Sequence, residues 1–361
     1  MKILYFSRDY TPHDHRFLSA LAKTEHKVYF LQLERRGHIT EERSLPPEIE
    51  LVTWAGGRGP VKFSDGPQLW ADLRRVAAKI QPDVIQAGPV QRSAFLAALA
   101  GLHPLVAMSW GYDLLIDAKR NRWWDWATRY TLKHSDAFLG DCNTIRHLAV
   151  AYGMRPDRIV TFPWGIDLRH FSPQASQPAN LSAFTLLSTR SWEPIYGVGV
   201  LAKAFVVAAQ QCSELRLILL GNGSLARELR RIFAQGNVEE RVTFPGHVGF
   251  ADLPRYYRMA DLYVSTSHSD GSSISLLEAM ACGTPALVSD IPGNREWVDG
   301  TGVGWLFADG NVQALVDAIL QAVSQRQRLP EMGRAARRLA EQRADWEKNF
   351  QEMEKLYAMV R

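Results

Sequence analysis

Short runs of β-branched and aromatic residues alternate along the chain with segments whose apolar residues recur at helical spacing. Helix-like segments such as Arg16–Lys23 and Gln68–Ile80 separate the strand-like runs. Strands that alternate with helices predict βαβ units and a parallel sheet. In the first half of the chain the strand-like runs are Lys2–Ser7, Lys27–Leu33, Glu50–Trp54, Asp83–Ala87, Leu105–Trp110, Ala137–Asp141 and Arg158–Pro163.

A segment without periodicity, Gly165–Ser182, interrupts this pattern. Its Pro, Ser and Ala content predicts an interdomain linker. We therefore predict two doubly wound domains, at residues 1–168 and 180–342, followed by one amphipathic helix, Arg343–Arg361. The strand pattern resumes after the linker at Ala183–Ser188, Leu215–Leu220, Arg241–Pro245, Leu262–Thr266, Pro285–Ser289 and Gly304–Phe307.

The composition is that of an ordinary globular protein, with 361 residues, 46% hydrophobic and 22% charged. No apolar run reaches the roughly 18 residues of a membrane span. Three cysteines, Cys142, Cys212 and Cys282, form no zinc-binding spacing. A sparse, odd set of cysteines indicates a reducing compartment, so we expect a cytoplasmic protein.

Basic residues are concentrated in the first half of the chain. Residues 1–180 contain 23 Lys and Arg against 18 Asp and Glu, whereas the remainder contains 19 against 20. Lys119–His134 is both basic and rich in Trp, which fits peripheral contact with the inner face of a membrane or with a lipid-linked acceptor. The alternatives are a mildly biased solvated surface and a buried aromatic stripe.

The most informative stretch is Asp261–Trp297, which predicts a strand, a polar loop and a helix. Small and hydroxyl residues before a helix leave its first backbone N–H groups accessible, and together with the helix dipole these suit a pyrophosphate. Asp270 in the loop and Glu278 one turn inside the helix are eight residues apart, so one carboxylate can face a sugar while the other accepts hydrogen bonds from a ribose diol. We predict ligand contacts from Gly271, Ser272, Ser273, Ile274 and Ser275.

This stretch resembles the signature of the retaining GT-B glycosyltransferases called glycosyl transferases group 1, or family 4. Their pattern is E-x7-E followed by A-M-A-x-G-x-P-V-V; here Asp270 takes the first Glu position and Glu278 begins EAMACGTPALV. The resemblance implies that Glu278 binds the nucleotide ribose and that Asp270 is a catalytic residue near the transferred sugar. The alternatives are a surface Glu and a loop-capping Asp.

Other stretches resemble the same family. Pro163–Pro173 (PWGIDLRHFSP) matches its domain junction, and LLGNGSLARELRRI matches its I-G-x-G stretch. In VTFPGHVGFADLPRYYRMAD the resemblance implies backbone contact with the base by Gly246, His247 and Val248. A surface histidine is the alternative for His247.

The second domain departs from the family at one phosphate ligand. Family members carry an Arg and, about six residues later, a Lys that grip the donor phosphates. Here Arg190 is kept, but Ile195 and Tyr196 occupy the position of the Lys, and Lys203 lies too far along the predicted helix to replace it. Arg190 is our predicted phosphate ligand, with a surface Arg as the alternative.

The first domain departs further. The usual glycine pair after the first strand is absent, and Asp14, His15 and Arg16 form a candidate acceptor or phosphate loop, although Asp14 can equally cap a helix. After a later strand, the place of the family's sugar-contacting His holds Trp110 and Asp113. We predict that Trp110 packs on a sugar face and Asp113 binds hydroxyls, as catalytic-site residues; a core Trp and a capping Asp are the alternatives.

The resemblance implies an α/β protein of the GT-B class, with two facing Rossmann-like domains and an interdomain cleft. It implies that residues 1–168 bind the acceptor, that residues 180–342 bind the donor, and that the terminal helix, Arg343–Arg361, packs back on the first domain. It implies a retaining transfer from a nucleotide-sugar, which we expect to be a UDP-sugar, to a sugar, lipid-linked or small-molecule acceptor. We expect no cofactor and no nucleic-acid partner. The chain has no D-x-D and no His/Cys cluster with ligand spacing, so we expect no metal, with Arg190 and helix dipoles meeting the phosphate charge.

Three rival functions follow from the same residues. Another GT-B enzyme, such as a phosphorylase or a nucleotide-sugar epimerase, would share the fold. A non-catalytic nucleotide-sugar-binding protein would explain the missing Lys. A dehydrogenase is disfavoured because no G-x-G-x-x-G follows the first strand.

Overall fold

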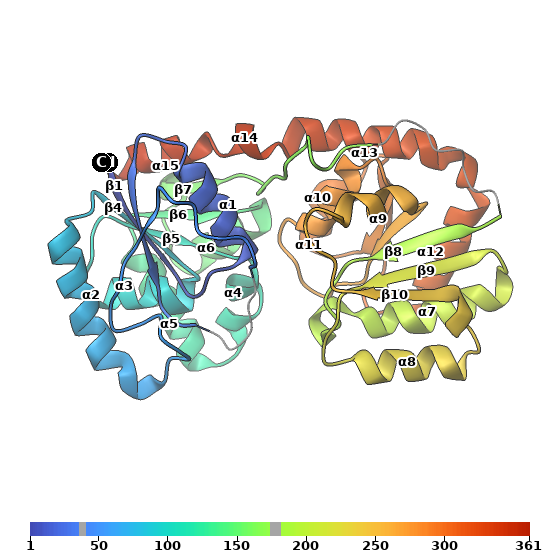
Figure 1. The fold of residues 1–361 in the computed structure, drawn as a ribbon, viewed down its shortest axis with the longest axis horizontal. Coiled ribbons are helices and arrows are strands. Elements are labelled where there is room, and N and C mark those ends of the chain that lie inside the picture. The colour runs from blue at the N-terminus through green and yellow to red at the C-terminus, as the bar shows by residue number, and fades with distance from the viewer. Residues whose placement is uncertain (36–40, 174–181) are drawn as a thin grey trace. The chain divides into compact units, whose positions relative to one another are not determined.

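A computed structural model describes residues 1–35, 41–173 and 182–361 of the chain (Figure 1). It consists of two compact units, one of residues 1–162 with 350–361 and the other of residues 163–349. The predicted first domain ends six residues after the division at residue 162, at residue 168, and the predicted second domain begins 17 residues after Pro163, at residue 180, and ends seven residues before Asn349, at residue 342. Each unit is a parallel β-sheet with accompanying helices.

The first unit contains a seven-stranded, all-parallel sheet in the order β3-β2-β1-β4-β5-β6-β7. Its order reverses between β1 and β4, and ligands bind beyond the carboxyl ends of strands at such a point. The strands are β1 (Lys2–Ser7), β2 (Lys27–Gln32), β3 (Glu50–Leu51), β4 (Val84–Gly88), β5 (Leu105–Met108), β6 (Ala137–Gly140) and β7 (Ile159–Thr161). The helices are α1 (Pro12–Leu21), η1 (Phe63–Asp65), α2 (Gly66–Ile80), η2 (Val90–Ala94), α3 (Phe95–Leu99), α4 (Tyr112–Leu115), η3 (Asp117–Lys119), α5 (Arg122–Lys133), α6 (Asn143–Ala151), η4 (Pro156–Arg158) and α15 (Glu352–Val360).

The second unit contains a six-stranded, all-parallel sheet in the order β10-β9-β8-β11-β12-β13, which reverses between β8 and β11. The strands are β8 (Phe184–Ser188), β9 (Leu215–Leu220), β10 (Val242–Gly246), β11 (Leu262–Ser265), β12 (Ala286–Ser289) and β13 (Gly304–Phe307). The helices are η5 (Pro194–Tyr196), α7 (Val198–Gln211), α8 (Ala226–Gln235), η6 (Glu239–Arg241), α9 (Leu253–Met259), α10 (Ile274–Ala281), α11 (Pro292–Val298), α12 (Val312–Ser324), η7 (Arg326–Arg328), α13 (Leu329–Arg343) and α14 (Trp346–Asn349).

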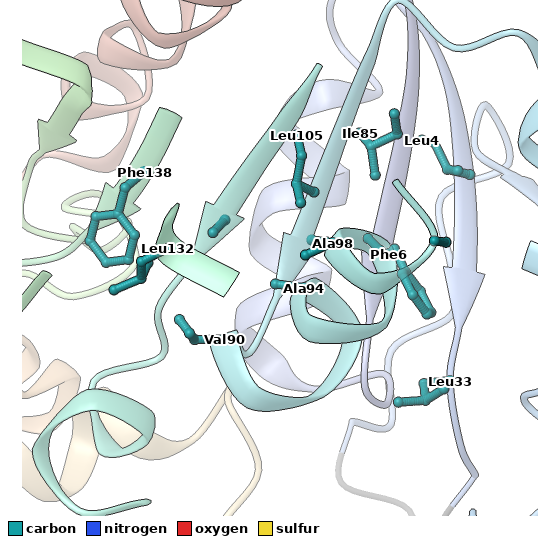
Figure 2. Packing of buried hydrophobic residues seen from close by; sticks show 14 of the residues in the cluster. Leu4, Phe6, Leu33, Ile85, Val90, Ala94, Ala98, Leu105, Leu132 and Phe138 are labelled. Atoms are coloured by element: carbon teal, nitrogen blue, oxygen red, sulfur yellow. The ribbon is translucent and has the colours of Figure 1, made fainter. Parts of the chain in front are cut away.

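The central strands of each sheet are buried on both faces, as expected when helices cover both sides of a parallel sheet. All five residues of β4 are buried, and so are all four of β5. In the first unit Leu4, Phe6 and Ile85 belong to a single cluster that also includes Ala94 and Ala98 of the following helices (Figure 2). None of the helices in the described residues is long and apolar enough to cross a bilayer.

Two sequence-based predictions are wrong at the boundary between the units. Gly165–Pro173 is not a free linker, because Ile166 pairs with Asp345 in a parallel bridge and Phe171 is buried in the second unit's core. The rest of the predicted linker, apart from Ser182, lies outside the described residues. The predicted helix Arg343–Arg361 is instead three pieces: the end of α13, then α14 in the second unit and α15 in the first.

Candidate functional site

The main group of polar side chains lies where the second unit's strand order reverses. Because β8 and β11 are neighbours in the sheet, the loops that leave their carboxyl ends are side by side. Arg190 lies two residues after β8, and Asp270 lies five residues after β11. The topology therefore brings together two residues that are 80 positions apart in the sequence.

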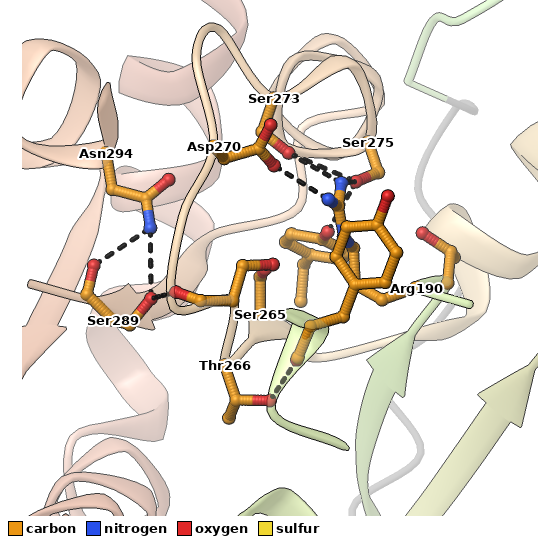
Figure 3. Close-up of polar contacts among 12 residues, drawn as sticks. Arg190, Ser265, Thr266, Asp270, Ser273, Ser275, Ser289 and Asn294 are labelled. Atoms are coloured by element: carbon orange, nitrogen blue, oxygen red, sulfur yellow. Dashed lines mark hydrogen bonds and ion pairs between the residues drawn. The ribbon is translucent and has the colours of Figure 1, made fainter. Parts of the chain in front are cut away.

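Arg190 is the centre of this group (Figure 3). Its Nη2 lies 2.8 Å from the Asp270 carboxylate, and its Nη1 donates to the Ser273 and Ser275 hydroxyls at 3.1 and 3.0 Å. Tyr263, on β11, donates to the Ser275 Oγ at 2.7 Å. The guanidinium is thus fixed at the loop that precedes α10.

Tyr196, which occupies the position of the family's Lys, packs on Arg190. The guanidinium carbon lies 4.2 Å from the centre of the tyrosine ring, and such cation–π contacts are favourable. Burial is the largest single effect and disfavours the charged form of Arg190. The Asp270 carboxylate, together with Tyr263, Tyr196 and Tyr257, outweighs it, so the pKa of Arg190 is raised. The site has one guanidinium with an aromatic platform where the family has two cations.

The segment that carries Tyr196 is held against the end of β11. Thr266 Oγ1 donates to the Tyr196 carbonyl at 3.0 Å, and the His268 N–H donates to the Ile195 carbonyl at 2.9 Å. The next residue, Gly197, has φ +59°, and a Cβ there would lie 2.1 Å from the Thr266 carbonyl oxygen. Glycine is therefore required at this turn before α7.

The first turn of α10 presents backbone N–H groups beside Arg190. Ser273 precedes Ile274, the first helical residue, without a capping side-chain hydrogen bond, and both Ser272 and Ser273 are buried. Helix α11 packs tightly on the same loop: a Cβ at Gly293 would lie 2.4 Å from the Gly271 carbonyl oxygen. The loop and the start of α10 are therefore closely packed beside Arg190, and anion binding at this helix N-terminus stays a prediction.

Glu278 lies one turn further along α10 and is 7% exposed. Tyr257 of α9 donates to its Oε2 at 2.8 Å, and the same hydroxyl is 3.1 Å from Thr189 Oγ1. Burial, followed by the neighbouring Glu278 carboxylate, raises the pKa of Tyr257, so the phenol remains protonated. Glu278 is therefore not a surface helix residue, and its carboxylate has a fixed orientation.

Gly246, His247 and Val248 lie at the same carboxyl edge of the sheet. The Gly246 carbonyl accepts from the Gly221 N–H at 2.7 Å, and a Cβ at Gly221 would lie 3.3 Å from the Arg190 carbonyl oxygen. The His247 side chain is exposed, and Val248 packs partly against the apolar cluster that includes Tyr257. Gly246 has φ +79°, a conformation that favours glycine.

In the first unit, Asp113 is placed to hold the backbone rather than a ligand. It is fully buried, and its carboxylate accepts from Ser109 Oγ at 2.6 Å and from the Val90 N–H at 3.0 Å. Burial raises its pKa to about 6, although the Ser109 hydrogen bond opposes the shift. These contacts favour the alternative of a structural Asp over direct binding of sugar hydroxyls.

Trp110 is half-buried and stacks on His13, with ring centres 5.2 Å apart. The neighbouring Phe17 contacts it edge-on at 6.0 Å. Burial, followed by the nearby Arg16, lowers the pKa of His13 to about 3, so the imidazole is neutral at pH 7. Trp110 therefore keeps part of its ring surface exposed beside a neutral aromatic partner.

The candidate loop after β1, Asp14 to Arg16, lies within the first turns of a helix, and Asp14 helps to cap that helix. Helix α1 begins at Pro12, earlier than predicted, and Asp14 is its third residue rather than its N-cap. Asp14 forms a capping box with Thr11 and accepts from Tyr5 Oη at 3.1 Å. His15 is 2.6 Å from Tyr10 Oη, and Arg16 is half-buried. Asp14 is fully buried, which favours the capping alternative over direct contact with a ligand.

A charged group that was not predicted from the sequence lies at the carboxyl edge of the first sheet. Arg8 follows β1 and forms an ion pair with Glu34, which follows β2. Arg92, in η2 after β4, stacks on Trp124 with its guanidinium 4.9 Å from the ring centre. Burial, followed by repulsion from Arg8, lowers the pKa of Arg92. Charged residues within four positions of the carboxyl ends of β1, β2 and β4 are the signal that could have identified this group.

Among residues 1–35, 41–173 and 182–361, no group of three or more His, Cys, Asp or Glu side chains is arranged to hold a metal ion. Metal independence itself stays a prediction.

Comparison with known families accounts for both units. The family model of Glycosyltransferase Family 4 matches residues 13–170, and that of Glycosyl transferases group 1 matches residues 174–339. Together they span nearly the whole chain. This chain belongs to the family 4, group 1 glycosyltransferases.

Relatives of this glycosyltransferase match the chain over part of its length. It is 31% identical over 234 residues to the D-inositol 3-phosphate glycosyltransferase of Xylanimonas cellulosilytica, covering 58% of this chain and 53% of the relative. It is 28% identical over 190 residues to the amylovoran biosynthesis glycosyltransferase AmsK of Erwinia amylovora, covering 50% and 45%. The matched segment thus spans about half the length of these relatives.

A solved structure supports the GT-B assignment of this glycosyltransferase. HepE from Anabaena, in complex with UDP, superposes with a TM-score of 0.80 over 99% of this chain and 100% of that chain, at 19% identity. The chain therefore has the GT-B fold, with one seven-stranded and one six-stranded parallel sheet.

Proposed function

We propose that this glycosyltransferase moves a sugar from a nucleotide-sugar, a UDP-sugar in particular, to an acceptor hydroxyl with retention of configuration and without a metal. The observation that carries the proposal is the Arg190 guanidinium, held by Ser273 and Ser275 at the start of α10, one turn from the fixed carboxylate of Glu278.

The donor phosphates would bind at Arg190 and at the first N–H groups of α10. A guanidinium can grip a phosphate through two parallel hydrogen bonds, and the helix dipole favours an anion at this end. Because Nη2 of Arg190 contacts Asp270 at 2.8 Å, an arriving phosphate would share or displace that carboxylate. Phosphate binding and the position of Asp270 are therefore coupled.

Glu278 would accept hydrogen bonds from the ribose hydroxyls. A carboxylate that accepts from a diol makes a strong, charge-assisted contact, and the Tyr257 hydroxyl holds this carboxylate in place. Gly246 and Val248, at the same edge of the sheet, would contact the base through their backbone.

Asp270 would face the transferred sugar. As the bond from the anomeric carbon to the diphosphate oxygen breaks, positive charge develops on the sugar and negative charge on the leaving oxygen. The acceptor oxygen then bonds to the same face of the anomeric carbon, and its proton passes to the leaving diphosphate oxygen. Arg190 stabilises the leaving group's charge. Because the acceptor oxygen itself bonds to the anomeric carbon, no protein nucleophile is required.

The donor and acceptor classes rest on the relatives. The HepE complex contains UDP, which supports a UDP-sugar. The named relatives act in amylovoran biosynthesis and on D-inositol 3-phosphate, which supports a sugar, lipid-linked or small-molecule acceptor. A second candidate function is non-catalytic binding of a nucleotide-sugar. The observation that favours it is Tyr196 at the position of the family's Lys, which leaves one cation fewer at the site.

A thermal-shift screen over nucleoside diphosphates and their sugars tests the proposal, because a ligand that binds only the folded protein raises its melting temperature. We expect UDP and one or more UDP-sugars to raise it. No shift with any nucleotide-sugar would contradict the proposal, and binding without hydrolysis or transfer would favour the non-catalytic alternative.

A further inference from the structure

Helix α5 carries an aromatic surface on its outward side. Trp123 is 51% exposed and Trp126 is 44% exposed, and their ring centres are 4.8 Å apart. The ring centres of Trp126 and Tyr130 are 5.4 Å apart, so the aromatic surface extends to Tyr130. Phe95 packs edge-on against all three rings, and Phe63 of η1, 89% exposed, extends the surface beyond Trp123. We call these five residues the aromatic ridge.

Helix α5 buries its small residues and exposes its large aromatic residues, although burial of the aromatic residues would remove more apolar surface from water. Its buried face consists of Ala127, Thr128, Thr131 and Leu132, whereas its largest apolar rings face outward. The alternative that Lys119–His134 forms a buried aromatic stripe is therefore wrong for Trp123 and Trp126. Contiguous exposed aromatic residues of this kind mark an interaction site rather than a packing requirement.

Exposed basic residues flank the aromatic ridge. Arg122 and Arg129 lie one turn before and one turn after Trp126, and Lys133 lies one turn after Arg129. Lys62 is next to Phe63, while Lys119 and Arg120 precede α5. The acidic residues of the same segments are engaged locally: Asp125 pairs with Arg129, and Asp65 accepts from the Lys62 N–H. Asp117, in η3, is half-buried and close to Arg120 and Arg92.

We propose that the aromatic ridge binds the interface of a lipid bilayer that contains anionic headgroups. Trp and Tyr prefer the boundary between headgroups and acyl chains, and surrounding Lys and Arg are attracted to anionic lipids. A neutral glycan could stack on the aromatic rings, but it carries no negative charge that would pair with the surrounding Lys and Arg. A second copy of the chain would place two basic surfaces together, which opposes self-association.

The lipid proposal is independent of the chemistry at Arg190 and Glu278, so its success or failure is separate from that of the proposed function. The experiment is co-sedimentation of the full chain with phosphatidylcholine vesicles, with and without phosphatidylglycerol. Three variants are compared: Trp123→Ala/Trp126→Ala, Arg122→Glu/Lys133→Glu, and the control Arg334→Glu/Arg338→Glu. The control makes the same charge change at two exposed arginines of α13 in the second unit.

We expect the native chain to bind the vesicles that contain phosphatidylglycerol, and added salt to weaken this binding because it screens the charges. The Arg122/Lys133 variant should bind about thirtyfold more weakly, from roughly 1 kcal/mol per basic residue. The tryptophan variant should lose about tenfold or more. The control should retain binding within about twofold, and thermal melts should show all variants folded.

Three results would overturn the proposal. The native chain could fail to bind either kind of vesicle, or the tryptophan variant could bind as the native chain does. The control could also lose as much binding as the Arg122/Lys133 variant, which would indicate a general charge effect. Sedimentation of the native chain with a neutral polysaccharide, or a dimer that the tryptophan variant dissociates, would assign the ridge to those partners instead.

Discussion

Arg190 and Asp270 form a partly buried ion pair at 2.8 Å, between the loop after β8 and the loop after β11. Their meeting follows from the reversal of strand order between these two neighbouring strands. The pair joins the proposed phosphate ligand to the proposed sugar-facing carboxylate. A bound diphosphate must therefore compete with Asp270 for the guanidinium.

This competition predicts different effects of Asp270→Asn on binding and on turnover. The amide keeps the size of the side chain but removes the charge that competes for Arg190. Affinity for free UDP, measured by calorimetry, should be unchanged or higher, while kcat with the donor sugar should fall about tenfold or more, as expected when a charge-assisted contact is lost.

Asp270→Glu is the matched variant, since it keeps the charge and restores the residue found in the family. It should retain more turnover than Asp270→Asn. If Asp270→Asn kept full turnover with a functional donor and acceptor, Asp270 would be a loop residue without a role at the sugar.

Tyr196 should support Arg190 through its ring rather than its hydroxyl. Tyr196→Ala removes the aromatic platform and should weaken UDP binding by roughly two- to thirtyfold, the range of a cation–π contact. Tyr196→Phe keeps the ring and should bind UDP as the native chain does. Equal losses in the two variants would show that the ring's contact with Arg190 is not what supports binding.

The first unit should lose stability as the pH rises from about 4 to above 6. Asp14 and Asp113 are both fully buried, and burial raises the pKa of each from 3.8 to about 6. The folded state therefore holds more protons than the unfolded state between these values. The stabilisation is fully present below pH 3.8 and is lost through pH 6, on the order of 3 kcal/mol for each carboxyl.

Urea unfolding of native and Asp113→Asn chains at several pH values measures this effect. The variant does not ionise at this position, so its stability deficit relative to the native chain should shrink as the pH rises from 4 to 7. Asp157→Asn, at a side chain that is 71% exposed, is the control and should show no such trend. A pH-independent deficit for Asp113→Asn would argue against the shifted pKa.

Turnover should persist in excess EDTA. Arg190 and the start of α10 are positioned to neutralise the phosphate charge, and no metal-ligand cluster occurs among the described residues. The assay compares initial rates with and without chelator, using a Mn²⁺-dependent glycosyltransferase as a positive control for chelation. Loss of activity that Mg²⁺ or Mn²⁺ restores would show that a metal is required.

The strands could be predicted because their signal is local. Runs such as Lys2–Ser7 and Leu215–Leu220 have the predicted bounds, since a buried parallel strand is apolar on both faces. The start of α1 could also have been found, because Thr11 followed by Pro12 is a helix-start signal. The dense polar residues Asp14, His15 and Arg16 instead suggested a ligand-binding loop, whereas Asp14 forms the capping box of α1, in line with the capping alternative.

Contacts between distant residues could not be predicted from the pattern. The stacking of Tyr196 on Arg190 and the hydrogen bond from Tyr257 to Glu278 depend on which strands are neighbours and on side-chain directions. The exposure of Trp123 and Trp126 could not be predicted either. Helix α5 has one aromatic face and one face of small residues, and either face can pack on a sheet. Only the tertiary structure decides which face is buried.

The central claim is that the loop before α10, with Arg190 and Glu278, binds a nucleoside diphosphate, and titration calorimetry with UDP tests it most directly. Glu278→Gln keeps the acceptor for the Tyr257 hydroxyl but removes the charge that the ribose hydroxyls would contact. The account predicts UDP binding to the native chain and a loss of about 1.5–3 kcal/mol in the variant, with an unchanged melting temperature in the absence of ligand. Equal UDP affinity of the native chain and Glu278→Gln would contradict it.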